Sequence, residues 1–273
     1  ALGLLLTAKW HSVDPFYYPS IVDGFVEKAE SFGYQVSIAD QTEPLLDFLN
    51  LRRRNVSAVA CVVLGEADLA ECDDLLDRGV SVVAINKYGG SRRIPSVSPN
   101  NREGAYLAAK HLMALGHKSF AFLDGPEGNF DSIERLKGIE RAFKEHDLPA
   151  RNLRVLEGGF MEESGYERGI HLAASGDLPT AVMAVSDLAA IGLMRAFAEQ
   201  GVRIPQDVSL FGFGDFRLSA YLTPSLSTVR LPLREIGAHA ALALVEQCRG
   251  VRTDAMSLPC PIIVRESVGS PRT

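Results

Sequence analysis

Short runs of apolar and β-branched residues alternate along this chain with stretches in which apolar residues recur every three or four positions. The first run, 2–7, reads Leu-Gly-Leu-Leu-Leu-Thr and predicts a buried strand. Ile21, Phe25 and Ala29 then share one helical face. Gly33 follows them, a residue type that commonly ends a helix. The chain therefore opens with one strand followed by one helix.

The same alternation continues to the C-terminus. Further strands are expected over 35–40, 58–64, 80–86, 119–124, 154–157, 181–185 and 208–213, and helices over 44–54, 68–78, 105–115, 133–143, 162–174 and 187–200. An Ala/Leu-rich helix over 233–248 and an apolar strand over 258–264 close the chain. Alternation of this kind predicts an α/β fold, with parallel sheets covered by helices on both faces.

Length and charge narrow this picture. The chain has 273 residues, which exceeds one compact core of the usual size and fits two βαβ halves of roughly 100–130 residues each. Lys and Arg total 28 against 34 Asp and Glu, so the net charge is −6. An acidic surface repels the phosphate backbone of nucleic acids. This chain by itself is therefore not expected to bind DNA.

The motifs of the commonest α/β enzymes are absent. The sequence contains no P-loop, no dinucleotide-binding glycine pattern after the first strand and no nucleophile elbow. Its 6 histidines and 4 cysteines do not show metal-ligand spacing, and no apolar run is long enough to span a bilayer. We expect neither an enzyme nor a metal or cofactor site. Cysteines of this kind fit reduced thiols in a cytoplasmic protein without a membrane partner.

Polar and aromatic residues follow several of the predicted strands, where open α/β sheets bind ligands. They are Lys9 to Phe16 with Trp10, Asn86-Lys87, Asp124 to Pro126, Ser186-Asp187 and Gly212 to Asp215. Trp10, the sole tryptophan, either stacks on a ligand or packs against the protein. Ser186 and Asp187 can equally serve as a helix cap. Such a set can form a polar pocket with aromatic walls.

A series of short motifs runs in order over nearly the whole chain. They are Asp-Pro-Phe at 14–16, Ala-Leu-Gly-His at 114–117, Glu-Arg-Leu-Lys-Gly at 134–138, Glu-Ser-Gly-Tyr at 163–166, Ile-Pro-Gln-Asp-Val-Ser at 204–209, Val-Ser-Leu-Phe-Gly-Phe-Gly-Asp at 208–215, Leu-Thr-Pro-Ser-Leu-Ser-Thr-Val-Arg at 222–230 and Ile-Val-Arg-Glu-Ser at 263–267. Together they resemble the lactose/galactose-repressor (LacI/GalR) family of bacterial transcription regulators. The part that they cover is the family's effector-binding core.

The resemblance implies a fold like that of type I periplasmic binding proteins, with two similar doubly wound parallel-sheet subdomains joined by crossover strands. The first subdomain would hold 1–99 and 230–259, and the second 100–229 and 260–273. The family's N-terminal helix-turn-helix domain is expected to be absent from this chain. The implied function is allosteric: a homodimer binds a small effector, a sugar or related polyol, between the subdomains. Operator DNA would be bound only through the missing domain.

The resemblance also implies which residues contact the effector. They are Phe16, Asn86, Arg135, Phe160 and Ser186, joined by Asp215. The loop before the first helix is longer than usual, which lets Trp10 or His11 reach the effector as well. Ser186 stands where the family commonly has Asn, and Gly214 stands where it commonly has the first of two Asp residues. The guanidinium of Arg135 can bind a carboxylate, a phosphate or a hydroxyl pair. Its alternative role is an exposed charge in the first turn of a helix.

Two other functions remain open on the sequence. A periplasmic sugar receptor of a transporter shares the implied fold, although the tail motifs favour a regulator. An enzyme using Asp215 or His11 as a base is the second alternative, and no catalytic motif supports it.

Overall fold

The computed structural model describes residues 1–6, 16–40, 56–87 and 93–272. They form two compact units: unit 1 contains Ala1–Pro99 and Pro232–Leu258, and unit 2 contains Asn100–Leu231 and Pro259–Thr273. Each unit is thus built from two separate stretches of sequence, and the chain passes from one unit to the other at 99–100, 231–232 and 258–259. The sequence predicted 230–259 for the second stretch of unit 1.

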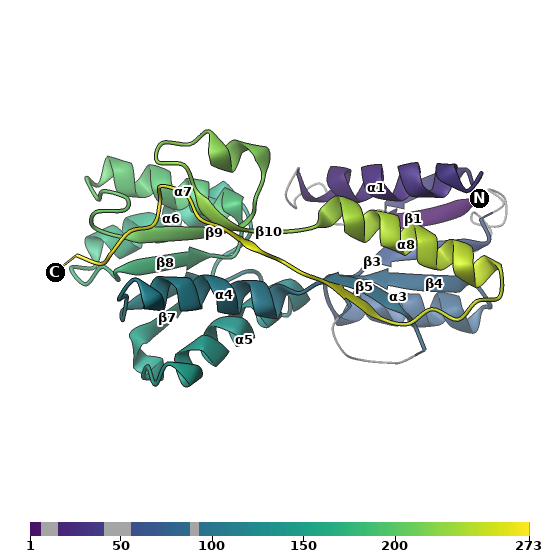
Figure 1. The fold of residues 1–273 in the computed structure, drawn as a ribbon, viewed down its shortest axis with the longest axis horizontal. Coiled ribbons are helices and arrows are strands. Elements are labelled where there is room, and N and C mark those ends of the chain that lie inside the picture. The colour runs from purple at the N-terminus through teal and green to yellow at the C-terminus, as the bar shows by residue number, and fades with distance from the viewer. Residues whose placement is uncertain (7–15, 41–55, 88–92, 273) are drawn as a thin grey trace. The chain divides into compact units, whose positions relative to one another are not determined.

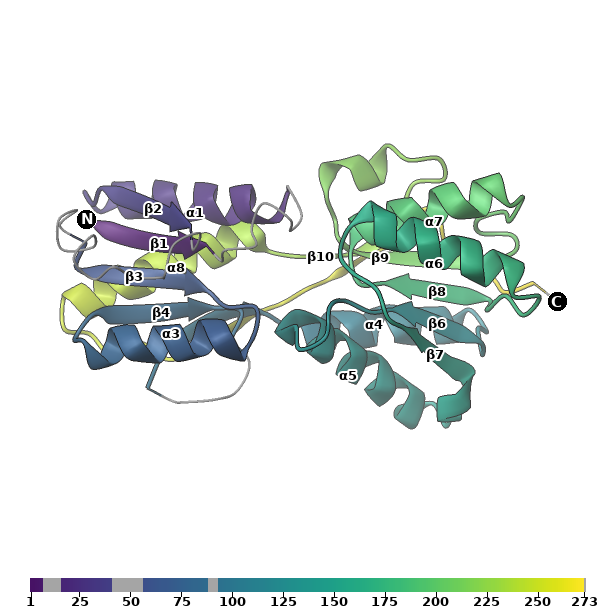
Figure 2. The same cartoon turned by 180° about the vertical axis from the view of Figure 1, so that it is seen from behind.

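Unit 1 is a parallel sheet between helices (Figure 1). Its strands are β1 (Leu2–Leu6), β2 (Val36–Asp40), β3 (Ala58–Val62), β4 (Ser81–Ile85), β5 (Ser96–Pro99) and β11 (Met256–Leu258), in the order β11-β5-β4-β3-β1-β2. Its helices are α1 (Tyr17–Ser31), α3 (Glu66–Asp77) and α8 (Leu233–Cys248). Helices α1 and α8 pack together on one face, and α3 lies on the other (Figure 2). Every residue of β1 and β3 is buried, as expected for strands covered on both faces.

Unit 2 repeats this plan. Its strands are β6 (Phe120–Leu123), β7 (Leu153–Leu156), β8 (Ala181–Ala184), β9 (Ser209–Gly214), β10 (Ser227–Arg230) and β12 (Ile262–Ile263), in the order β12-β10-β9-β8-β6-β7. Only β12 is antiparallel to its neighbour among these strands. Helices α4 (Asn101–Ala114) and α5 (Phe130–Glu145) form one packed pair, and α6 (Glu162–Ala174) and α7 (Asp187–Glu199) form another (Figure 2). The expected architecture of two parallel-sheet α/β subdomains is confirmed.

The structure differs from the expected elements mainly at the segments that join the units. Strands β5 and β10 were not predicted, because they read Ser-Val-Ser-Pro and Ser-Thr-Val-Arg and contain no run of apolar residues. The strand expected over 258–264 is two strands, β11 and β12, in different sheets. Pro259 and Pro261 separate them, and proline cannot donate to a strand ladder. The helix expected over 44–54 lies outside the described residues.

The strand order places the ligand-binding edge of each sheet. In unit 1 the chain moves outward from β1 to β2 in one direction and to β3, β4 and β5 in the other, so the order switches between β1 and β3. In unit 2 the same switch falls between β6 and β8. Open α/β sheets bind ligands beyond the carboxyl ends of the strands at this point. Residues that follow these strands are therefore the candidates for a site.

Candidate functional site

Arg135 lies at the switch point of unit 2. It belongs to the second turn of α5, and its Nη1 donates to the carbonyl oxygen of Val185, the residue directly after β8. Its Nε donates to Oδ1 of Asn101, 3.0 Å away, at the start of α4. The guanidinium also lies over the Phe213 ring, with 3.9 Å from its central carbon to the ring centroid, and 5.8 Å from that of Phe160. These contacts hold one flat cation in a fixed orientation beside the strand ends.

The interpretation of Arg135 as an exposed charge is wrong. Its side chain is buried, with 2% of the residue exposed. It also lies six residues into α5, beyond the first turn in which the sequence analysis placed it. Two hydrogen bonds and an aromatic stack hold the guanidinium inside unit 2. Arg135 therefore has a structural role in addition to any contact with a ligand.

Phe160 and Ser186 lie together next to this arginine. The hydroxyl of Ser186 donates to the carbonyl oxygen of Phe160 and accepts from the backbone N–H of Ala189, 3.0 Å away. The second bond caps α7, so the helix-cap interpretation of Ser186 is confirmed. With its only proton committed to Phe160, Ser186 can still accept one hydrogen bond. Its main effect is to fix the loop that carries the Phe160 ring.

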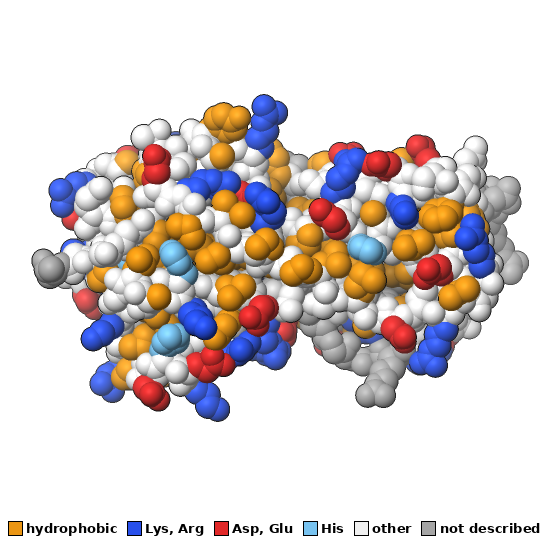
Figure 3. Space-filling view, in the orientation of Figure 1, with side chains coloured by type: hydrophobic (Ala, Val, Ile, Leu, Met, Phe, Trp, Pro, Cys, Tyr) orange, Lys and Arg blue, Asp and Glu red, His pale blue; other side chains and the backbone are white. Residues whose placement is uncertain are grey.

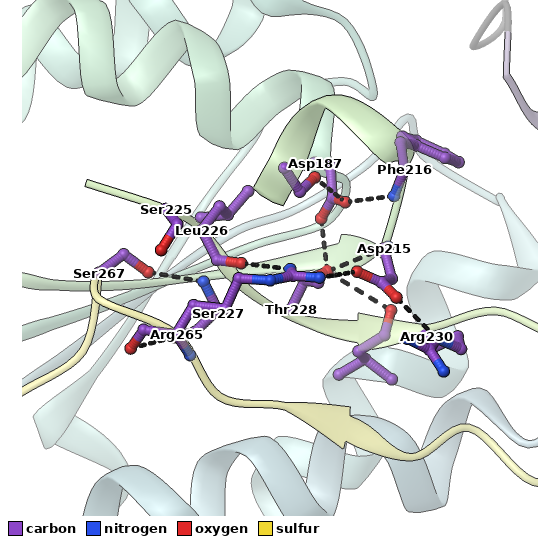
Figure 4. Close-up of polar contacts among 12 residues, drawn as sticks. Asp187, Asp215, Phe216, Ser225, Leu226, Ser227, Thr228, Arg230, Arg265 and Ser267 are labelled. Atoms are coloured by element: carbon purple, nitrogen blue, oxygen red, sulfur yellow. Dashed lines mark hydrogen bonds and ion pairs between the residues drawn. The ribbon is translucent and has the colours of Figure 1, made fainter. Parts of the chain in front are cut away.

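Asp187 organises a buried polar network at the start of α7 (Figure 4). Its Oδ1 accepts from the Thr228 hydroxyl at 2.5 Å. Its Oδ2 accepts from the Ser219 hydroxyl at 2.6 Å and from the backbone N–H of Phe216 at 3.0 Å. Burial raises the pKa of this carboxyl above its usual value, and the three hydrogen bonds oppose that rise. The carboxylate ties α7 to the segment after β9, and both of its oxygens are in use.

The carboxylate of Asp215 is held by two arginines, as Figure 4 shows. One oxygen accepts from Nε of Arg230 and the other from Nη2 of Arg265, both at 2.6 Å. The Asp215 side chain is 7% exposed. Its backbone has φ +56°, a left-handed conformation that aspartate tolerates better than most residues. Asp215 was expected to contact an effector. Both of its carboxylate oxygens accept hydrogen bonds from arginines of unit 2.

Gly214 contributes no polar group next to Asp215. It has φ +150°, and a Cβ placed on it would come within 2.9 Å of the Phe216 ring. A side chain here would have to displace that ring. The resemblance implies a carboxylate at this position, and glycine cannot provide one.

In unit 1, Asn86 follows β4 and is completely buried. Its Nδ2 donates to the Tyr17 hydroxyl at the start of α1, while its Oδ1 has no hydrogen-bond partner among the described residues. Its backbone has φ +68°. A buried amide oxygen without a partner is costly, and it offers a hydrogen-bond acceptor to a hydroxyl or N–H group.

The remaining predicted residues of unit 1 are less informative. Phe16 is half-buried and directly precedes α1, where its carbonyl oxygen accepts from the Ser20 hydroxyl. Trp10 lies outside the described residues.

Three residues that the sequence analysis did not single out take part in these sites. Tyr17 contacts Asn86, Asn101 orients Arg135, and Phe213 carries the guanidinium. Phe213 belongs to the motif at 208–215, so the signal for it was present. Asn101 and Tyr17 carry no local signal, because their contacts come from residues 34 and 69 positions away.

The described part of the chain holds no cluster of metal-ligating side chains, since no group of three or more His, Cys, Asp or Glu residues there could bind an ion. None of its helices is long and apolar enough to cross a bilayer. All 4 cysteines are free.

Comparison with known proteins identifies the family and similar transcriptional repressors. The family described as "Periplasmic binding protein-like domain" matches residues 109–268. The HTH-type transcriptional repressor PurR of Vibrio vulnificus is 28% identical over 277 residues, covering 98% of this chain and 80% of the repressor.

Solved structures agree in fold. A complex of the transcriptional regulator CelR with cellobiose superposes with a TM-score of 0.86 at 25% identity, covering 97% of this chain and 84% of CelR. A dimeric Lac repressor with a C-terminal deletion gives a TM-score of 0.85 at 23% identity and covers 99% of both chains.

Proposed function

This chain belongs to the periplasmic binding protein-like family and is an effector-binding core of the LacI/GalR type. We propose that it binds a small polar effector and thereby controls an attached DNA-binding domain. The relatives are transcriptional repressors, which favours a regulator over a transport receptor. Ligand binding would favour one of two conformations of the core. This shift would change the affinity of the DNA-binding domain for its operator. We propose no catalytic turnover for it and place it in the cytoplasm with its operator.

The observation that carries this proposal is the placement of Arg135. A buried guanidinium lies at the strand-order switch of unit 2, stacked on Phe213 and close to Phe160. Fixed donors beside aromatic faces are what a small polar ligand needs in order to bind in one orientation. We propose Trp10, Phe16, Asn86, Arg135, Phe160, Ser186 and Asp215 as the residues from which the effector contacts are drawn.

The roles of these residues are unequal. Arg135 and Phe160 offer a donor fork and an aromatic face, and Asn86 offers its unpartnered Oδ1. Ser186 and Asp215 would chiefly position neighbouring residues, because their side-chain oxygens already form hydrogen bonds within the protein. A sugar or related polyol suits this mixture of rings and hydrogen-bonding groups. CelR, which is similar to this chain, binds cellobiose.

We further propose that the core is a homodimer, with the interface largely on helices of unit 1. The similar Lac repressor structure is dimeric, and two-fold assemblies suit the two-fold operators of helix-turn-helix proteins. Sedimentation at tens of micromolar should give a dimer. A monomer at that concentration would contradict the proposal.

A thermal-shift screen of the chain tests effector binding. The panel comprises sugars, polyols, sugar phosphates, sugar acids and nucleosides. A ligand at 100 times its Kd stabilises the folded state by about 2.7 kcal/mol, which is readily measured. At least one compound should raise the melting temperature, and calorimetry should show one class of saturable site.

Two further results would count against a regulator. Turnover of a stabilising compound would indicate an enzyme. A secretion signal encoded directly before Ala1, in place of a helix-turn-helix domain, would indicate a transport receptor.

A further inference from the structure

We propose that the carboxylate of Asp215 is a clamp that fixes the direction in which two crossover segments leave unit 2. The chain leaves unit 2 for unit 1 at 231–232 and returns at 258–259. Residues 226–231 are called the outgoing segment, and residues 259–265 the returning segment. Asp215 is then a positioning residue for the conformational change of the core. This role goes beyond the proposed function, because it does not depend on which effector binds.

The backbone joins the two segments only over a short stretch. Strand β10 of the outgoing segment pairs with β12 of the returning segment, and β12 has 2 residues. Next to this ladder, the N–H of Arg230 donates to the carbonyl oxygen of Pro261 at 2.8 Å. Pro259 and Pro261 have no N–H of their own to donate. Backbone pairing alone therefore gives the two segments little support close to the crossovers.

Asp215 adds a side-chain connection to both segments at once (Figure 4). Its Oδ2 accepts from Nε of Arg230, the last residue of β10, and its Oδ1 accepts from Nη2 of Arg265, two residues beyond β12. Arg265 also donates from Nη1 to the carbonyl oxygen of Leu226 at 2.7 Å, so its guanidinium spans the two segments. Hydrogen bonds between charged groups are stronger than those between neutral ones. One carboxylate thus holds the outgoing and the returning segment together.

The clamp is fixed to the carboxyl end of the central strands of unit 2. Asp215 directly follows β9, and the N–H of Leu231 donates to the carbonyl oxygen of Gly214 at the end of that strand, 3.2 Å away. The N–H of Asp215 donates to the Thr228 hydroxyl oxygen at 3.3 Å, and that hydroxyl donates to Asp187 at the start of α7. A displacement at the ends of β9 or α7 is therefore passed to both segments through contiguous hydrogen bonds.

Charge compensation alone does not explain the second arginine. One arginine balances the charge of one carboxylate, and Arg265, whose side chain is 18% exposed, already lies against Asp215. Asp187 is more deeply buried than Asp215 and is held by two hydroxyls and a backbone N–H, without an arginine. The contact of Arg230 with Asp215 therefore has another use, which is to hold the residue that directly precedes the crossover at 231–232.

The exposure of Arg230 separates a local role from a role in overall stability. Its side chain is 55% exposed, whereas that of Asp215 is 7% exposed. Exposed ion pairs contribute little to the free energy of unfolding, because water solvates the separated charges. Loss of the Arg230 contact should therefore release the outgoing segment without unfolding unit 2.

Hydrogen–deuterium exchange of the ligand-free chain tests the clamp. Arg230→Gln should speed amide exchange about threefold in the outgoing segment, as expected for loss of a half-exposed ion pair. Exchange in β8, inside the same sheet, and the urea midpoint should stay nearly unchanged. Arg195→Gln is the matched control, because it removes an α7 arginine that pairs with Glu199 and is 74% exposed. It should leave exchange in both segments unchanged.

Asp215→Asn tests the shared partner. It should speed exchange about tenfold in both segments, since it removes charge-assisted hydrogen bonds to two arginines. The comparison uses labelling times at which β8 has not yet exchanged, so that local release is separated from global unfolding. Adding Arg230→Gln to Asp215→Asn should change exchange of the outgoing segment little further, because both substitutions break the same contact. If Asp215→Asn does not fold, Arg230→Gln still decides.

The role in conformational change is measured by the distance between the units. Spin labels on Cys248, which is the exposed cysteine of the chain, and on an exposed α6 position through Glu167→Cys report this distance by double electron–electron resonance. Labelled chain is diluted with unlabelled chain, so that only distances within one molecule are recorded. Arg230→Gln should broaden the distance distribution, and Arg195→Gln should not.

Three results would overturn the clamp. Unchanged exchange of the outgoing segment in Arg230→Gln would show that the contact does not hold it. Equally faster exchange in β8 and in the two segments would show that the cluster serves overall stability only. Local release with an unchanged distance distribution would show that the segments do not limit the conformational change. Effector binding is tested separately by the thermal-shift panel, so either proposal can fail alone.

Discussion

Asp187, Asp215 and Arg135 are three of the charged side chains that unit 2 buries, and each is compensated differently. Asp187 is surrounded by hydroxyl and backbone donors, and Asp215 is paired with two arginines. Arg135 donates to the side-chain oxygen of Asn101 and to the carbonyl oxygen of Val185, and it stacks on the Phe213 ring. No carboxylate of the described residues forms an ion pair with it. Asp187 and Asp215 are therefore compensated by direct contacts on both carboxylate oxygens, whereas Arg135 has no ion pair among the described residues.

At the residue scale, Asp215→Ala should destabilise the chain. Removal of the carboxylate leaves Arg265, largely buried, and Arg230, about half exposed, without their ion pair. Breaking a fully buried pair costs about 3–5 kcal/mol, and we expect about 2–3 kcal/mol here because Arg230 remains solvated. Urea unfolding measures the loss.

The control for this substitution is Asp177→Ala. The Asp177 carboxylate also faces an arginine, Arg154, but its side chain is 85% exposed. It should unfold at the urea concentration of the unsubstituted chain. Equal midpoints for the two variants would mean that the Asp215 cluster adds no stability.

At the scale of elements, glycines set how closely the helix pairs approach. A Cβ on Gly165 of α6 would lie 1.9 Å from the carbonyl oxygen of Ala189 in α7, and one on Gly192 would lie 2.0 Å from that of Glu162. The two helices thus touch backbone to backbone. Similar contacts join α1 to α8, where a Cβ on Gly24 would lie 1.9 Å from the carbonyl oxygen of Arg234.

Gly165→Ala should therefore force α6 and α7 apart. Overpacking of this kind typically costs about 1–3 kcal/mol, and scanning calorimetry should show a lower melting temperature. Gly159→Ala is the control, because its Cβ would meet nothing closer than 3.7 Å. That variant should melt at or above the temperature of the unsubstituted chain, since alanine reduces the freedom of the unfolded state. A tolerated Gly165→Ala would contradict the close packing.

At the scale of the whole molecule, charge argues against direct DNA binding. The net charge is −6, and acidic and basic side chains are interspersed on the face shown in Figure 3. DNA-binding surfaces gather cations, because phosphate contacts supply most of the non-specific affinity. A chain with this charge distribution is not expected to bind DNA by itself.

The chain by itself should show no specific operator binding in a mobility-shift assay at physiological salt. Fusion to a helix-turn-helix domain should confer it, with effector-dependent affinity. Nanomolar, sequence-dependent binding by residues 1–273 alone would contradict this prediction.

The sequence by itself determined the fold class and the family. Apolar periodicity is a local property, so strands such as 58–62 and helices such as 162–174 are visible in it, and the motif at 208–215 carries the resemblance to the family in consecutive residues. Strands β5 and β10 were not predicted, because they lack an apolar run and are defined by the partners beside them in the sheet. The division of 258–264 between two sheets is likewise set by long-range pairing.

Only the tertiary structure decided what each candidate side chain has left to offer. Arg135 and Asp215 both looked like free charged groups in the sequence. Residues far apart in the chain then showed that Asp215 is already paired, by Arg230 and Arg265, whereas Arg135 is buried without an ion pair to any described residue. Whether a polar side chain has all of its hydrogen-bond partners depends on every group that folding brings within about 3 Å. Those groups come from distant parts of the chain, so the local sequence does not predict them.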